Sequence, residues 1–154
     1  MISNKRIHKE ISELTDIYEL SFHNNSIDYR DKTVNLMIYI NSKIMIEFLI
    51  NRNYPFYPPS VFLNNRRYPY YLTQLPNELQ EYLKYRKNDN CLCCFTITCV
   101  NKWLPNYKIA YIINEIKYIH LLILNYYQKK VTNKLCNIKN IMDMNTLINS
   151  FIGL

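Results

Sequence analysis

The sequence predicts an α+β fold, with one helix ahead of an antiparallel sheet and further helices after it. Three observations support this prediction. Apolar residues recur at helical spacing between residues 4 and 20, and β-branched runs between residues 33 and 63 are typical of strands. After Trp103-Leu104-Pro105, isoleucines at helical spacing indicate a long helix with one apolar face.

The first half of the chain contains the first helix and the sheet. Apolar side chains three or four residues apart predict a helix over Asn4–Leu20, and a polar loop comes next at His23–Lys32. Strands are predicted at Thr33–Ile40 and Lys43–Leu49, joined as a hairpin, with a third strand at Ser60–Leu63. The prolines between the second and third strands exclude regular structure there, because they remove donors and fix φ.

The second half of the chain is predicted to be mainly helical. A tyrosine-rich loop is expected over residues 64–76, followed by a short helix at Pro76–Arg86. Cys91–Val100 is expected to be extended or irregular. Pro105-Asn106 opens the longest predicted helix, and a final helical segment is expected from Asn137 to Phe151.

Composition indicates a single domain spanning residues 1–154. Of its 154 residues 49% are apolar and 20% charged, as in ordinary globular domains. Charged or polar residues interrupt both the N-terminus and the apolar segment Ile109–Leu124, so we expect neither a secretory signal nor a membrane partner. Five cysteines, an odd number, do not resemble a secreted disulfide framework. We therefore expect a reduced intracellular protein of the cytoplasm or nucleus.

The formal net charge of +7 favours an acidic partner. Basic and tyrosine residues occur together in residues 66–71 and 84–87, a combination that can bind single-stranded nucleic acid. Neither segment belongs to a recognisable nucleic-acid module, so nucleic acid is the less favoured partner.

Three sequence blocks succeed one another along the chain. They are KRIHKEI (Lys5–Ile11), NYPFYPPSVFL (Asn53–Leu63) and CFTITCVNKWLPNYKIAYIINEI (Cys94–Ile116). Together they resemble the ubiquitin-conjugating enzyme family: its first helix, its Tyr-Pro-Phe-x-Pro-Pro turn and third strand, and its active-site cysteine with Trp-x-Pro and crossover helix. The resemblance implies a ubiquitin-conjugating-enzyme-like fold, with an N-terminal helix, an antiparallel β-meander, a long crossover helix and a C-terminal helical segment.

The resemblance also implies an activity. In the family, a cysteine accepts the C-terminal acyl group of ubiquitin, or of a ubiquitin-like modifier, from an activating enzyme in an ATP-dependent pathway, and passes it to a substrate lysine. The matching position is Cys94, nine residues before Trp103. The surface that meets the activating enzyme and a ubiquitin ligase is matched by Lys5, Arg6, Lys9, Phe56 and Pro105. No cofactor and no metal is implied.

The sequence leaves the nucleophile and its surroundings open. Cys93 competes with Cys94, because adjacent residues of an extended segment point in opposite directions. The family's His-Pro-Asn triplet has no clear counterpart, since Tyr70 stands where its Asn belongs. Other candidates for that amide are Asn77, Asn88 and Asn90. The alternative function is a catalytically inactive module of the same fold that engages ubiquitin or a ligase without forming a thioester.

The cysteines also have interpretations unrelated to catalysis. Cys91 and Cys99 fit buried apolar positions, which are common for reduced cysteine, and the whole cluster could be core thiols. Together with the pair between them they could bind zinc, but Cys-x-Cys-Cys spacing suits a tetrahedral site poorly. A cysteine protease is disfavoured because the histidines have simpler explanations, with His8 at a helix surface and His120 at the packing edge of the long helix.

Overall fold

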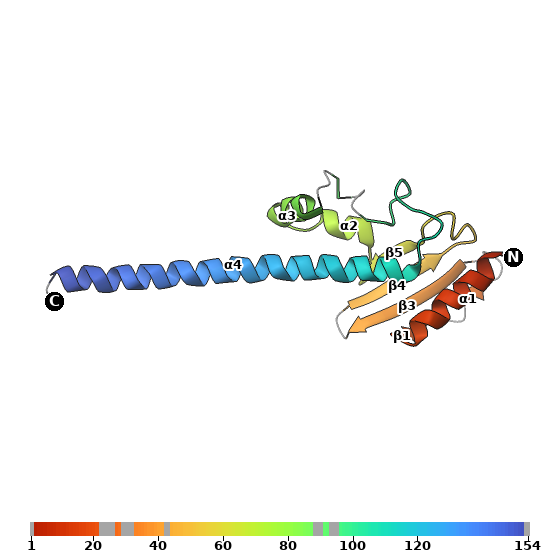
Figure 1. Ribbon diagram of the computed structural model, residues 1–154, viewed down its shortest axis with the longest axis horizontal. Coiled ribbons are helices and arrows are strands. Elements are labelled where there is room, and N and C mark those ends of the chain that lie inside the picture. The colour runs from red at the N-terminus through yellow and green to blue at the C-terminus, as the bar shows by residue number, and fades with distance from the viewer. Residues whose placement is uncertain are drawn as a thin grey trace. The chain divides into compact units, whose positions relative to one another are not determined.

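The computed structural model describes residues 2–21, 27–28, 33–41, 44–87, 91–92 and 96–152, and it confirms an α+β fold with an antiparallel sheet (Figure 1). The helices are α1 (Ile2–Thr15), α2 (Tyr68–Thr73), α3 (Asn77–Lys87) and α4 (Ile109–Ile152). The strands are β1 (Glu19–Ser21), β2 (Ile27–Asp28), β3 (Thr33–Asn41), β4 (Ile44–Ile50), β5 (Ser60–Leu63) and β6 (Arg66–Arg67). The chain divides into two compact units, Met1–Tyr118 and Ile119–Leu154. The first unit contains the sheet, α1 to α3 and the start of α4.

The sheet has the order β1-β3-β4-β5-β6, with β2 also paired to β3, and every pairing is antiparallel. The predicted hairpin is confirmed as β3 and β4, and the predicted third strand as β5. Leu36 lies opposite Phe48, and Ile38 opposite Ile46, and all four side chains are fully buried. Val61 of β5 extends this buried face. One face of the hairpin therefore belongs to the core, as expected for side chains that alternate along a strand.

The helix predicted to reach Leu20 ends at Thr15 instead, and residues 19–21 form β1 beside α1 (Figure 1). The carbonyl oxygen of Leu14 accepts the N–H groups of Ile17 and Tyr18, which closes the helix in a tight turn. The next residues pair with β3, which satisfies their backbone groups. Ile17 fits the helical spacing but is 68% exposed, so spacing alone places the end of the helix too late.

Two predicted loops contain regular structure. Of the polar loop at His23–Lys32, β2 is the part that the structure describes. The tyrosine-rich stretch at residues 64–76 contains β6 and α2, so the prediction of a loop there was wrong. Pro69 stands in the first turn of α2, where its missing N–H has no helical partner to lose. Tyr68 and Leu72 lie one helical turn apart and are both buried, so they form the apolar face of α2. This face was missed because the tyrosine-rich composition suggested a loop.

The helices predicted in the second half are present with different ends. α3 confirms the helix expected at Pro76–Arg86. α4 begins at Ile109 rather than at Pro105-Asn106, because a turn closed by the N–H of Tyr107 precedes it. Its 44 residues run without a break through the segment predicted as a separate helix at Asn137–Phe151. The predicted apolar face is confirmed by the burial of Ile109, Ile112, Ile113 and Ile116.

Candidate functional site

The predicted nucleophile Cys94 and its competitor Cys93 lie outside the residues that the structure describes, as do the amide candidates Asn88 and Asn90. Asn77 is described, and it is exposed at the first position of α3. The described flanks of the cysteine pair are packed, with Leu92 before it and Thr96 after it both buried. Cys91 and Cys99, predicted to be buried, are half-buried, and His120, predicted at a packing edge, is exposed.

Residues 96–103 form a series of turns that leads from the cysteines to Trp103. The N–H of Cys99 donates to the carbonyl of Thr96 at 3.1 Å, and the carbonyl of Cys99 accepts the N–H of Trp103 at 2.9 Å. The hydroxyls of Thr96 and Thr98 lie 2.8 Å apart and share a hydrogen bond. This part of the segment is therefore irregular rather than extended, and local hydrogen bonds fix it.

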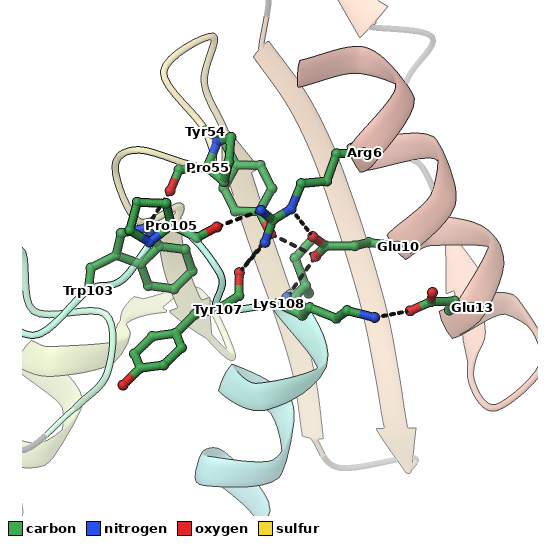
Figure 2. Close-up of polar contacts among 10 residues, drawn as sticks. Arg6, Glu10, Glu13, Tyr54, Pro55, Trp103, Pro105, Tyr107 and Lys108 are labelled. Atoms are coloured by element: carbon green, nitrogen blue, oxygen red, sulfur yellow. Dashed lines mark hydrogen bonds and ion pairs between the residues drawn. The ribbon is translucent and has the colours of Figure 1, made fainter. Parts of the chain in front are cut away.

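Arg6 and Glu10 of α1 form the centre of a polar network that reaches the start of α4 (Figure 2). Arg6 Nε donates to Glu10 Oε1 at 2.7 Å. Its two terminal nitrogens donate to the carbonyl oxygens of Pro105 and Tyr107, the latter at 2.7 Å. A spacing of four residues places Arg6 and Glu10 on the same side of the helix. One guanidinium thus ties α1 to the loop before α4.

The second carboxylate oxygen of Glu10 completes the network. Glu10 Oε2 accepts the Tyr54 hydroxyl at 2.7 Å and the N–H of Ile109, the first residue of α4, at 2.9 Å. A carboxylate is favourable at this end of a helix, because the first N–H groups lack helical partners and carry partial positive charge. Glu10 is 3% exposed, so these donors stabilise a charge that would otherwise be costly to bury.

Burial and the neighbouring charges shift two pKa values in this network. Burial, reinforced by the hydrogen bond to Glu10, raises the pKa of Tyr54 well above its ordinary value. Burial acts to lower the pKa of Arg6, but the hydrogen bond and charge of Glu10 outweigh it and raise that pKa. Arg6 therefore stays cationic and the Tyr54 hydroxyl stays a donor across the physiological pH range.

Trp103 joins the proline-rich turn at residues 51–59 to the loop before α4. Its indole N–H donates to the carbonyl oxygen of Pro55 at 2.7 Å, and the indole is buried. The ring centroid lies 6.0 Å from that of Tyr54 and 5.7 Å from that of Tyr107, which it meets edge-on. Figure 2 shows how Tyr54 and Trp103 bring the turn, the loop and α1 into one cluster.

The predicted partner-binding residues fall into two groups. Lys5, Lys9, Phe56 and Pro105 are exposed. Phe56 is the most conspicuous of them, because an aromatic side chain on a rigid turn is 73% exposed. Arg6 is half-buried, and its guanidinium is engaged by Glu10 and by two backbone carbonyls. Arg6 therefore joins α1 to the loop that carries Pro105.

Leu104 extends the exposed surface beyond the predicted residues. It comes directly after Trp103, as Phe56 comes directly after Pro55, so the Trp103–Pro55 hydrogen bond joins the loops that carry these two side chains. Leu104 is 49% exposed. Its place between Trp103 and a proline is the signal by which the sequence could have identified it.

A second buried carboxylate, that of Glu115 in α4, lies beside the segment after the cysteines. Its Oε1 and Oε2 accept the N–H of Ile97 at 3.2 and 3.1 Å. The ammonium of Lys87, the last residue of α3, lies 3.8 Å from Oε1. Burial raises the pKa of Glu115, although the bond from Ile97 and the charge of Lys87 act to lower it.

The sequence predictions do not include Glu10 or Glu115, although each leaves a trace in the sequence. Glu115 stands after Ile112 and Ile113 and before Ile116, so an acidic residue interrupts a buried face. A charge at such a position is rare unless it is paired. Glu10 stands four residues after Arg6, which suggests an ion pair but not the bond from the N–H of Ile109, 99 residues further along the chain.

Comparisons of the chain with protein-family models, with curated proteins and with solved structures found no match. Among the described residues, no three His, Cys, Asp or Glu side chains are grouped so that they could hold a metal ion. In the part of the chain with described structure, no helix combines the length and apolar character needed to cross a membrane.

Proposed function

We propose that this protein is a ubiquitin-conjugating-type transferase, which carries ubiquitin or a ubiquitin-like modifier as a thioester on Cys94 and passes it to a substrate lysine. The observation that carries the proposal is that the three blocks resembling the family are hydrogen-bonded to one another. Arg6 of the first block donates to the carbonyls of Pro105 and Tyr107 in the third. Trp103 of the third donates to Pro55 of the second.

The reaction consists of two acyl transfers. In the first, the Cys94 thiolate attacks the carbonyl carbon of the modifier's C-terminus, which arrives as a thioester on the activating enzyme. A new C–S bond forms as the old one breaks, and the activating enzyme's thiolate leaves. In the second, a lysine amine attacks the Cys94 thioester, a C–N bond replaces the C–S bond, and the amine loses a proton to solvent. A cysteine suits both steps: its thiolate is a strong nucleophile in the first, and the thioester that it forms is a reactive acyl donor in the second.

The exposed side chains around the joined loops and on α1 are proposed to bind the activating enzyme and the ligase. Phe56 and Leu104 are apolar side chains on two joined loops, with Pro105 beside Leu104, and Lys5 and Lys9 are exposed on α1. Aromatic anchors on rigid turns lose little conformational entropy on binding, which favours them as interface hot spots. The lysines suit an acidic protein surface, in keeping with the net charge of +7.

The thioester itself is the first test. Incubation with an activating enzyme, ATP and a panel of ubiquitin-like modifiers is expected to give an adduct that thiol reagents cleave, as seen on a non-reducing gel and by intact mass. Cys94→Ser is expected to give an oxyester that survives thiol treatment, and the neighbouring control Cys93→Ser is expected to keep the thioester. A thioester retained by Cys94→Ser and lost from Cys93→Ser would move the nucleophile to Cys93. No adduct with any modifier, together with binding of ubiquitin or a ligase, would establish the inactive module instead.

The docking surface is tested by Phe56→Ala. Loss of a central aromatic anchor is expected to raise the dissociation constant for an activating enzyme or ligase roughly 30-fold, which corresponds to about 2 kcal/mol. Folding stability is expected to change by no more than about 0.5 kcal/mol, because Phe56 lies at the surface. The matched control is Tyr85→Ala on α3, which removes an aromatic side chain that is 83% exposed. Equal losses in the two variants would contradict a specific role for Phe56.

A further inference from the structure

Within the unit Ile119–Leu154, helix α4 carries apolar side chains on two opposite sides. Ile119, Leu122 and Ile123 are buried, as on one side of an ordinary amphipathic helix. The other side carries five exposed residues, which we call the outer stripe: Leu121, Leu124, Gln128, Val131 and Leu135. A rotation of about 100° per residue places the buried group and the outer stripe on opposite sides of the helix.

The outer stripe is exposed although four of its five side chains are apolar. The exposed fractions of these four run from 46% at Leu124 to 61% at Leu135. Every residue from 127 to 136 is exposed, so in the described structure this part of α4 is uncovered on all sides. Helices in proteins take most of their stability from packing, and a single helix is marginal in water. A partner that covers the outer stripe would supply this missing packing.

The spacing of the outer stripe is that of a coiled-coil seam. Its members follow one another at intervals of three, four, three and four residues. This alternation gives the average interval that keeps a seam facing a neighbouring helix. Leu121, Gln128 and Leu135 therefore occupy one of the two core positions of a heptad, and Leu124 and Val131 occupy the other. The partner that this pattern indicates is a second helix, which lies alongside α4.

The residues that flank the outer stripe carry little charge. Asn125 and Thr132 lie on one side of it, and Tyr127 and Lys134 on the other. The other two lysines between residues 124 and 136 lie further round the helix. Flanking residues select a coiled-coil partner by charge. With one lysine among the four, an oppositely charged helix gains little here, and two identical helices place few like charges across the seam.

Gln128 is the polar member of the outer stripe, and it favours an identical partner. Its amide has both donors and an acceptor, so two copies of Gln128 can hydrogen-bond to each other. In a parallel pair of identical helices each seam residue faces its own copy, because a two-fold axis relates the helices. Against the apolar seam of a foreign helix, the same amide would be buried without a partner. A polar residue at a core position lowers stability but fixes the register and the number of helices.

We propose that the outer stripe is the interface of a homodimer, in which α4 of two copies forms a parallel two-stranded coiled coil with Gln128 facing Gln128. The inference does not rest on the proposed transferase function. All five residues belong to the unit Ile119–Leu154, whereas the docking surface and the cysteines near Trp103 belong to the other unit.

The oligomeric state of the full chain tests the proposal. Sedimentation velocity from about 1 to about 200 µM is expected to show a reversible rise from the mass of one chain to that of two. Val131→Glu places two carboxylates against each other in the seam, and we expect it to weaken dimerisation at least about 100-fold. The matched control is Asn133→Glu, which adds the same charge to an exposed residue on the far side of the helix. It is expected to change the dissociation constant by no more than about 3-fold.

Three further measurements examine the geometry of the pair. Gln128→Leu removes the amide pair, so we expect association to tighten roughly 10-fold and species larger than a dimer to appear. Oxidation of Leu124→Cys is expected to join the introduced thiols of two copies, as mapped by peptide mass, because a parallel pair places residue 124 opposite itself. Hydrogen exchange of the amides of residues 127–136 is expected to slow as the dimer forms and to stay fast in Val131→Glu.

Several outcomes would overturn the proposal. One is a chain that stays monomeric over the whole concentration range. Another is a dimer that Val131→Glu and Asn133→Glu weaken equally, since its interface would lie elsewhere, and a dimer without the disulfide at residue 124 would exclude the parallel arrangement. Circular dichroism of each variant at low concentration checks folding, which we expect to be retained because the substituted side chains are exposed.

A foreign acidic helix as the occupant would give a different pattern. The chain would remain monomeric but bind a synthetic helix with a leucine seam and glutamate flanks, and this binding would weaken as salt rises. The homodimer is expected to tighten slightly with salt instead, because salt screens the like charges of the two copies. The salt dependence of association therefore separates the two occupants, and the first pattern would overturn the proposal.

Discussion

Replacing Glu10 by alanine is expected to lower the free energy of unfolding by about 3–5 kcal/mol. The substitution leaves the Arg6 guanidinium, the Tyr54 hydroxyl and the N–H of Ile109 without the carboxylate that accepts from all three. Buried donors without acceptors are more destabilising than the mean value of a hydrogen bond suggests. Urea unfolding monitored by far-ultraviolet circular dichroism measures the loss. For a domain whose total stability is about 5–15 kcal/mol, it is a large fraction.

The matched control for Glu10 lies one turn further along α1. Glu13 accepts from Lys108 at 2.9 Å, so it also joins α1 to the loop before α4, but its side chain and that of Lys108 are exposed. Water and salt screen such a pair, and its net contribution is small. Glu13→Ala is therefore expected to leave the urea midpoint nearly unchanged. A loss in Glu13→Ala equal to that in Glu10→Ala would contradict burial as the source of the effect.

Trp103→Ala is expected to destabilise the fold by about 3–5 kcal/mol, the usual cost of removing a large buried aromatic side chain. The indole fills the space between the rings of Tyr54 and Tyr107 and bonds to Pro55. Trp103→Phe keeps most of the ring packing and leaves the Pro55 carbonyl without its donor. Its expected cost is about 1–3 kcal/mol, so the two variants separate packing from the hydrogen bond.

Leu104→Ala serves as the control for the Trp103 variants, because it changes the next residue of the same loop where the side chain is half exposed. A loss of no more than about 0.5 kcal/mol is expected, again from urea unfolding. Both Trp103 variants are also expected to weaken partner binding, since the indole joins the loops that carry Phe56 and Leu104. Intact binding in a folded Trp103→Phe variant would show that the two loops hold their places without the Pro55 bond.

Strands β3, β4 and β5 were predictable, because a run of β-branched residues is a property of neighbouring residues alone, whereas β1, β2 and β6 were not. The end of α1 was less predictable. Ile17 suits both a longer helix and the turn into β1, and pairing of Glu19–Ser21 with β3 decides between them. The same holds for α2, since tyrosine suits loops, strands and buried helix faces alike. In each case a contact distant in sequence outweighs a local preference.

In the candidate site, too, features that depend on neighbouring residues were predictable and contacts between distant residues were not. The family resemblance implies Phe56 as a surface residue, while the sequence alone leaves open that it packs against Trp103 or Tyr57; its side chain is 73% exposed. The contacts of Arg6 could not be predicted, since its carbonyl partners lie some hundred residues further along the chain. Helical spacing shows that Arg6 and Glu10 lie on the same side of α1, but it does not show which residues that side contacts. Glu115 is similar: a lone acid on an apolar face indicates a partner without identifying it.

The burial of Trp103 has an optical consequence. It is the sole tryptophan among 154 residues, and its indole is enclosed where the proline-rich turn meets the loop before α4. Indole emission responds to the polarity of its surroundings and to loss of a hydrogen bond. With excitation at wavelengths where the fifteen tyrosines absorb little, the emission therefore comes from a single known place, next to the residues proposed to bind partners. Docking of an activating enzyme fragment or a ligase domain that lacks tryptophan could be monitored by this emission alone, without a label.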